Sequence, residues 1–143
     1  MALICHVRQT AKLEEVDRQL QSRLKKELVI WFVTAGRDGK PQAVPVWFLF
    51  DGDSFLIYSQ PGIKVRHVRE NPNVALHLNT DEVGDVVVRV SGKARISPAE
   101  PPADKVAAYV RKYGEQIKGF GWTPQVFAEK YPFAIRVRSL QFS

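Results

Sequence analysis

The sequence is poor in cysteine, with one among its 143 residues. Cys5 cannot form a disulfide within the chain, and a metal site built on it would need ligands from elsewhere. We therefore interpret Cys5 as structurally incidental. The three histidines, His6, His67 and His77, are too scattered in the sequence to propose a metal site.

Long hydrophobic runs are also missing. The longest apolar stretches, 29–33 and 43–50, are far shorter than the roughly 20 residues that cross a bilayer. The N-terminus MALICHVRQTAKLEE lacks the layout of a signal peptide. These absences predict a cytoplasmic protein with no membrane partner.

Charge of one sign is never concentrated. The net charge of +6 raises nucleic acid as a partner, but no run of five like charges occurs and acids accompany most of the cations. We therefore expect no nucleic-acid binding.

The motifs that name common enzyme classes are absent. There is no glycine fingerprint for a dinucleotide, no phosphate loop ending in GK[ST], and no serine or cysteine in a nucleophile-elbow context. The carboxylates lie in turns and on helix faces, so no acid–base pair stands out. If the chain is an enzyme, we expect a bound cofactor to carry its reaction.

What is present is an ordinary globular composition, with 45% hydrophobic and 25% charged residues, and one domain over residues 1–143 is expected. Apolar periodicity and turn signals predict strands at 28–34, 40–50, 54–59, 73–79, 86–96 and 133–142. Short turns between the first three strands predict an antiparallel meander. Six strands with peripheral helices indicate the α+β class and a small antiparallel barrel.

Helices are expected at 13–26, 63–69 and 125–130, with one more after the capping-box spacing of Ser97 and Glu100. Thr123 and Pro124 have the cap and first-position signals of the last helix. The connection Gly119-Phe120-Gly121-Trp122 could form an adaptable lid over a pocket or a tight link between helices.

The stretch SQPGIKVRHVRENPN, residues 59–73, gathers three cations after a Pro-Gly turn. A helix beginning near Ile63 leaves its first amides unpaired, and its dipole adds partial positive charge there. Lys64 can add a full charge and Ser59 a hydroxyl donor, which together predict a phosphate-sized site.

The other two cations of that stretch need separate interpretations. Helical geometry places Arg66 on the opposite flank from Lys64, so its role stays open. Arg69 falls in the last turn, where a cation suits the helix dipole, and we expect it to face solvent.

A proline inside a strand marks Val44-Pro45-Val46-Trp47, where it predicts an edge, a bulge or a non-strand neighbour. A flat heterocycle could lie there, bonded by the amides of Val46 and Trp47, with Trp47 or Tyr58 as a wall. An edge strand with ordinary core aromatics is the alternative.

One long segment resembles the pyridoxamine 5'-phosphate oxidase-like split β-barrel family of flavin- or deazaflavin-binding proteins. It is LVIWFVTAGRDGKPQAVPVWFLFDGDSFLIYSQPGIKVRHVRENPNVALHLN, residues 28–79. DEVGDVVVRVSGKARI and GFGWTP…YPFAIRV resemble the family's branch of reductases that depend on the deazaflavin coenzyme F420. The resemblance covers nearly everything from Leu13 to Val137. It implies a six-stranded antiparallel split β-barrel.

The resemblance further implies a homodimer with cofactor sites at the interface. By position, Ser59 and Lys64 match the phosphate-binding residues of the family, with Arg66 as a helper, and 44–47 matches the strand beside the ring. Asn79 matches a polar residue near the cofactor, and Trp122 and Arg136 would come from the partner chain. The C-terminal RVRSLQFS lacks the histidine of the segment that binds pyridoxamine phosphate in the oxidase itself.

The function expected from this resemblance is hydride transfer from reduced F420 to an electron-poor small-molecule substrate. The alternatives are an FMN-dependent oxidase or reductase and a non-catalytic carrier of flavin or haem.

Overall fold

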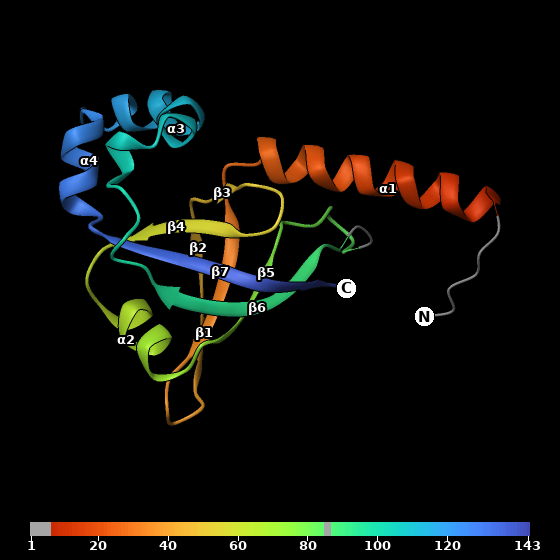
Figure 1. Ribbon diagram of the computed structural model, residues 1–143, viewed down its shortest axis with the longest axis horizontal. Helices are drawn as coiled ribbons and strands as arrows, with labels where there is room; N and C mark the ends of the chain where they lie inside the picture. The colour runs from red at the N-terminus through yellow and green to blue at the C-terminus, as the bar shows by residue number, and fades with distance from the viewer. Residues whose placement is uncertain (1–6, 85–86) are drawn as a thin grey trace.

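The computed structural model describes residues 7–84 and 87–143 and has the expected α+β class (Figure 1). Its helices are α1 (Val7–Lys26), α2 (Ile63–Glu70), α3 (Ala107–Gly119) and α4 (Pro124–Lys130), with a 3-10 turn, η1, at Ala103–Lys105. Its strands are β1 (Ile30–Ala35), β2 (Pro41–Val46), β3 (Leu49–Phe50), β4 (Phe55–Ser59), β5 (Asn73–His77), β6 (Arg89–Ile96) and β7 (Phe133–Phe142). Every expected element has a counterpart, although several boundaries differ.

The described strands form one antiparallel sheet in the order β2-β1-β5-β6-β7-β4-β3. Figure 1 shows β4, β7 and β6 crossing in front of β1, β2 and β5, so the sheet curls into a half-barrel. Helices α3 and α4 gather at one end, α2 covers a corner, and α1 projects from the other side.

The strand count of six was wrong, because the strand expected at 40–50 is two strands. Both antiparallel pairings expected between consecutive segments form, β1 with β2 and β3 with β4, but the middle segment is broken, so β2 and β3 lie at opposite ends of the sheet order. β2 pairs with β1 alone, while β4 lies between β3 and β7.

The break between β2 and β3 has a side-chain cause. The Phe48 amide donates to the Tyr113 hydroxyl at 2.8 Å, and the Phe48 carbonyl accepts from Lys112 Nζ, also at 2.8 Å. Side chains from α3 thus replace a neighbouring strand as partners of this backbone. Pro45 lies just before the break on edge strand β2, so the edge position predicted for this proline is confirmed.

Two apolar clusters share strand β4, all of which is buried. Phe55 and Ile57 belong to the cluster inside the half-barrel, while Leu56 and Tyr58 belong to the cluster beneath α3 and α4. Because successive side chains of a strand point to opposite faces, β4 separates the two cores. The second core is the one that borders the candidate site.

Helix α3 begins later than its capping-box signal predicted. Ser97 Oγ lies 3.4 Å from Glu100 Oε2, but the Ser97 amide bonds to the Ala134 carbonyl, so the reciprocal capping box does not form. Pro101 and Pro102 follow, and the α-helix starts only at Ala107. The cap of α4 is confirmed, since Thr123 Oγ1 accepts from the Val126 amide at 3.2 Å.

The C-terminal half of α2 is fixed to the turn after β1. His67 Nδ1 lies 3.0 Å from Thr34 Oγ1, and the Arg37 amide donates to Glu70 Oε1 at 3.0 Å. A Cβ on Gly36 would stand 2.6 Å from that same carboxylate oxygen, so a larger residue here would push the end of the Glu70 side chain aside. These contacts hold α2, and therefore Lys64, in place against the sheet.

Within the described residues, no helix is long and apolar enough to span a membrane. Cys5 and His6 lie outside the described part of the chain, as do Asp85 and Val86 at the start of the strand expected from 86. His77 stacks on Trp31 with their ring centroids 6.0 Å apart.

Candidate functional site

A cavity of about 350 Å³ lies between the sheet edge, the start of α2, and helices α3 and α4. Its volume is within the range of small-molecule sites. Its lining residues are Pro45, Val46, Trp47, Tyr58, Gln60, Lys64, Tyr109, Phe120, Trp122, Phe127 and Tyr131. The fold therefore brings together six of the residues predicted from the sequence: Pro45, Val46, Trp47, Tyr58, Lys64 and Trp122. Trp122 was expected from the partner chain, but here it lines the cavity of its own chain.

Lys64 forms the basic end of the cavity. Burial lowers the pKa of its ammonium group, and its Nζ lies 3.4 Å from Ser59 Oγ. No acidic side chain in the described ranges pairs with it. A half-buried cation without a carboxylate is suited to an anionic ligand.

The backbone beside Lys64 adds further donors. The first α-helical bond of α2 runs from the Arg66 amide to the Gly62 carbonyl, so the amides of residues 63–65 have no partner within the helix. Ser59 is buried, and its hydroxyl donates to the Gln60 carbonyl at 2.8 Å. That hydroxyl would have to rotate to donate to a ligand.

The opposite wall of the cavity is aromatic. Trp47 stacks on Tyr113 with ring centroids 4.6 Å apart and planes 4° apart, and on Phe127 at 5.5 Å. Tyr58 donates its hydroxyl to the Pro101 carbonyl at 2.6 Å, and burial, followed by the charge of Glu100, raises its pKa to about 12. These flat apolar surfaces favour a planar ligand.

The segment from Gly119 to Trp122 closes the end of α3. Gly121 has a φ of +79°, and its amide bonds to the Lys118 carbonyl while the Trp122 amide bonds to that of Ile117. This pair of bonds is the Schellman arrangement that ends a helix. Phe120 and Trp122, with ring centroids 5.2 Å apart, both line the cavity. The tight helix connection is confirmed, and the lid motion stays a prediction.

Tyr109 is a wall residue that the sequence analysis missed. Its side chain is 0% exposed, and its hydroxyl has no hydrogen-bond partner among the described residues. Burial raises its pKa, so the phenol stays protonated. An unpaired buried hydroxyl costs about 1 to 3 kcal/mol. The available signal was its spacing of four residues from Tyr113 on the same helix face.

Other predicted residues lie outside the wall of this cavity. Arg66 is exposed and approaches Glu70 at 3.9 Å, while Ile63 is 48% exposed. Val44 packs against the core of the half-barrel. Asn79 accepts from Trp31 Nε1 at 2.8 Å through its side chain.

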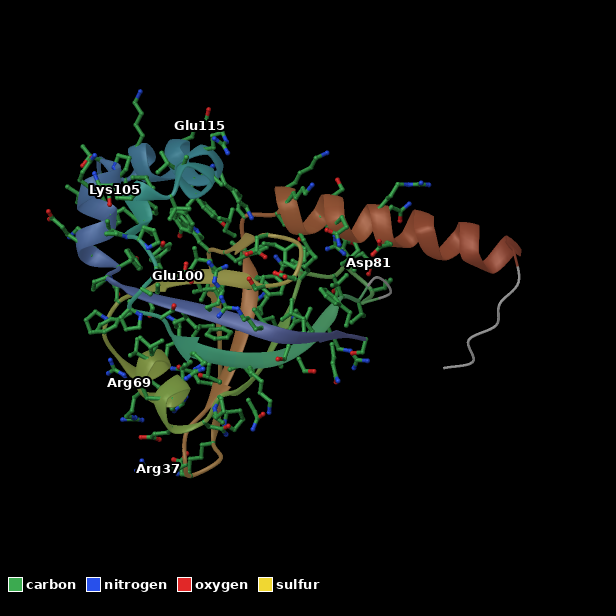
Figure 2. All side chains as sticks on the ribbon, in the orientation of Figure 1. Arg37, Arg69, Asp81, Glu100, Lys105 and Glu115 are labelled. Carbon is green, nitrogen blue, oxygen red and sulfur yellow. The ribbon has the colours of Figure 1, made fainter. Side chains whose placement is uncertain are left out.

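Arg136 lies in a separate ion-pair cluster, which we define as Arg136, Glu100, Asp51 and Ser54. The guanidinium meets Glu100 Oε1 at 2.7 Å and Asp51 Oδ2 at 3.0 Å. Figure 2 labels Glu100, which lies where the helical end meets the sheet. In this chain Arg136 therefore neutralises its own carboxylates, and its role at a partner's site stays a prediction.

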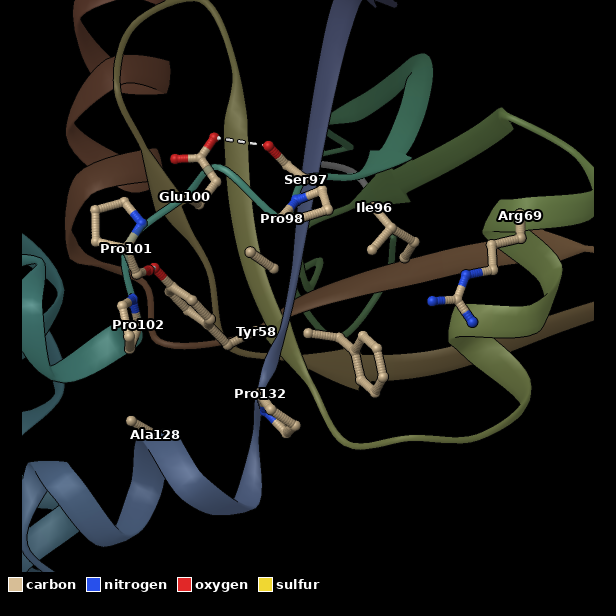
Figure 3. Close-up of a pocket in the computed structure, with 12 residues that line it drawn as sticks. Tyr58, Arg69, Ile96, Ser97, Pro98, Glu100, Pro101, Pro102, Ala128 and Pro132 are labelled. Atoms are coloured by element: carbon tan, nitrogen blue, oxygen red, sulfur yellow. Dashed lines mark hydrogen bonds between the residues drawn. The ribbon is translucent and has the colours of Figure 1, made fainter.

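A second cavity of about 440 Å³ also has Tyr58 in its wall (Figure 3). Arg69 reaches this cavity, with its guanidinium carbon 5.4 Å from the centre of the Phe133 ring. Arg69 is exposed, as expected for the end of α2. The three cations of the 59–73 stretch thus face three surroundings: Lys64 the first cavity, Arg66 a glutamate, and Arg69 an aromatic ring.

A family model described as Pyridoxamine 5'-phosphate oxidase matches residues 16–141. No curated protein sequence gives a significant match.

Several solved structures are similar to the chain. A putative pyridoxamine 5'-phosphate oxidase from Listeria innocua is 20% identical with a TM-score of 0.63, over 89% of this chain and 97% of that one. An F420 reductase is 23% identical with a TM-score of 0.62, over 86% and 94%. HutZ, a haem storage protein from Vibrio cholerae, is 12% identical with a TM-score of 0.58, over 87% and 92%. At these identities the similarities show the fold, which is the split β-barrel.

Proposed function

The chain belongs to the pyridoxamine 5'-phosphate oxidase family, and we propose that it is an oxidoreductase that uses F420 to reduce an electron-poor small molecule. The observation that carries the proposal is the cavity that joins Lys64, at a helix N-terminus, to an aromatic wall beside a sheet edge. A phosphate at one end and a planar ring at the other match that layout.

Lys64 and the free amides of α2 hold the phosphate in this proposal. The lysine supplies a charge-assisted hydrogen bond, and the helix N-terminus supplies backbone donors and partial positive charge. Ser59 adds its hydroxyl after rotation away from the Gln60 carbonyl. The half-buried position of Lys64 increases the electrostatic attraction, because fewer water molecules screen the contact.

The ring lies along edge strand β2. Pro45 lies on this edge, which has no further strand beside it, and the backbone amides of Val46 and Trp47 are the proposed donors to polar atoms of the ring. Trp47, Tyr58 and Trp122 then exclude water from its faces. When bound, reduced F420 supplies the hydride, while the protein positions the reactants and keeps the cavity dry.

Calorimetric titration with F420 and with FMN tests the cofactor assignment. We expect saturable binding of F420. Tight binding of FMN alone would replace this assignment with an FMN-dependent oxidase or reductase of the same family. Binding of neither compound would remove the proposal.

Turnover separates an enzyme from a carrier. Reduced F420 is mixed with the protein and with a panel of quinones and activated alkenes, and oxidation is followed by absorbance. We expect at least one acceptor to be reduced faster than without protein. If bound cofactor stays reduced with every acceptor, the non-catalytic carrier of flavin or haem is the better assignment.

We also propose that the chain acts as a homodimer whose partner completes each site. Ile63, beside Lys64, is 48% exposed and Phe120, in the cavity wall, is 61% exposed, and a second copy would cover such apolar side chains. Light scattering of the purified protein should give twice the mass of one chain, and a monomer would contradict this part of the proposal.

A further inference from the structure

The three buried tyrosines beside the candidate cavity differ in what their hydroxyls bind. Tyr58 donates to the Pro101 carbonyl at 2.6 Å. Tyr113 accepts from the Phe48 amide at 2.8 Å and donates to the Leu28 carbonyl at 2.7 Å. The hydroxyl of Tyr109 has no partner among the described residues, although its side chain is fully buried.

An unpaired hydroxyl in this position calls for an explanation, because native proteins pair nearly all of their buried polar groups. The ring of Tyr109 already packs against three aromatic rings, with its centroid 5.1 Å from that of Tyr58, 5.0 Å from that of Tyr113 and 5.8 Å from that of Phe127. A phenylalanine would make the same ring contacts without burying a polar atom. The hydroxyl therefore adds nothing visible to the packing of the unliganded chain.

We propose that Tyr109 binds the ligand of this cavity, with its hydroxyl donating a hydrogen bond to an oxygen or nitrogen acceptor on the planar part of that ligand. This inference rests on the proposed function, because it assumes that a planar cofactor or its substrate enters the cavity. The location supports it: Tyr109 lines the cavity and lies within the aromatic cluster that includes Tyr58 and Phe127. Burial keeps the phenol protonated and able to donate.

The hydroxyl is closed to water in this structure, so a ligand reaches it only when a neighbouring ring moves aside. The rings that pack against Tyr109 are those of Tyr58, Tyr113 and Phe127. One of these three rings must therefore shift for a ligand acceptor to meet the hydroxyl.

The test compares two matched variants on the same helix, Tyr109→Phe and Tyr113→Phe. Both remove one hydroxyl and keep the ring. Thermal unfolding is measured without ligand, and calorimetry is run with F420, with FMN, and with riboflavin, which lacks the phosphate. Tyr109→Phe should keep or raise the Tm and weaken binding of the ring-bearing probes about ten-fold, riboflavin included. Tyr113→Phe should lower the Tm and change affinity by no more than about three-fold.

Two results would overturn the inference. If Tyr109→Phe lowers the Tm as much as Tyr113→Phe does, the hydroxyl has a partner inside the protein, such as a bound water. If it binds every probe as the wild type does, the hydroxyl does not meet the ligand. Failure of the proposed function is a different result, because there the wild type itself would bind none of the three probes.

Discussion

Two cations of this chain, Lys64 and Arg136, have opposite surroundings, although the sequence suggested a cofactor role for both. The Arg136 side chain is 12% exposed and is neutralised by the carboxylates of Glu100 and Asp51. Lys64 lines a cavity with no acidic partner in the described part of the chain, and its nearest polar contact is Ser59 Oγ at 3.4 Å. The first arrangement satisfies the charges inside the fold, whereas the second leaves a charge for a ligand.

The difference shows how stability and binding are divided in this molecule. The Arg136 cluster joins residues 51, 54, 100 and 136, which are far apart in the sequence, so it connects the turn before β4, the loop before η1 and strand β7. Lys64 makes no such connection. Substitutions at Arg136 should therefore affect unfolding, and substitutions at Lys64 should affect binding.

The largest effect is expected for Arg136→Met. The change leaves Glu100, whose side chain is 15% exposed, without its counter-ion, and the free energy of unfolding should fall by about 2 to 3 kcal/mol. Urea denaturation measures this loss. Arg138→Met, at an exposed position on the same strand, is the matched control and should cost less than about 0.5 kcal/mol. Equal losses in the two variants would show that the cluster contributes little.

The next largest effect is expected for substitution of Lys64. Lys64→Ala should weaken binding of F420 or FMN by about 1.5 to 3 kcal/mol, because one charge-assisted contact to phosphate is lost. Its unfolding free energy should change little. Arg66→Ala removes a nearby cation outside the cavity and should leave affinity within about two-fold. If calorimetry finds the two variants alike, the anion site is elsewhere.

A smaller effect on stability is expected at acidic pH. The hydrogen bond from Arg136 lowers the pKa of Glu100 below its ordinary value of 4.5. A lowered carboxylate pKa contributes stability above the unfolded-state pKa, and that contribution is lost as pH falls through the folded-state pKa. We expect the wild type to lose stability from this source as the pH falls below the ordinary glutamate pKa of 4.5. Glu100→Gln, followed by urea denaturation over that acidic range, should show a shallower decline, and an unchanged slope would contradict the assignment.

The smallest effect is expected at Lys112, a cation whose surroundings are intermediate between those of Lys64 and those of Arg136. Lys112 is half-buried like Lys64, but its Nζ donates to the Phe48 carbonyl, and burial lowers its pKa to about 8. Above that pH the folded chain releases a proton that the unfolded chain retains, so stability should rise slightly, by less than about 1 kcal/mol, towards about pH 9.5. Denaturation of Lys112→Met should lack this rise. A fall in wild-type stability over that interval would mean that the carbonyl bond outweighs the cost of burying the charge.

Local signals predicted much of this molecule. The helix starting at Ile63, the cap at Thr123 and the edge position of Pro45 each depend on a few neighbouring residues, and all three are confirmed. The family resemblance identified the split barrel, which local patterns could only indicate as a small antiparallel barrel.

Features that depend on distant partners were not predictable in the same way. The break at Phe48 is caused by Lys112 and Tyr113, more than 60 residues away in the chain. The carboxylates that neutralise Arg136 come from two other segments, so no pattern around Arg136 reveals them. The unpaired hydroxyl of Tyr109 is likewise visible only once its surroundings are packed.

The positions of the three tryptophans have a spectroscopic consequence. Trp47 and Trp122 line the candidate cavity, while Trp31 stacks on His77 away from that wall. An absorbing ligand in the cavity would quench the first two by energy transfer over a very short distance. A Trp31→Phe protein would keep Trp47 and Trp122 and lose the emission of Trp31. Its intrinsic tryptophan fluorescence would then report ligand occupancy without an added label.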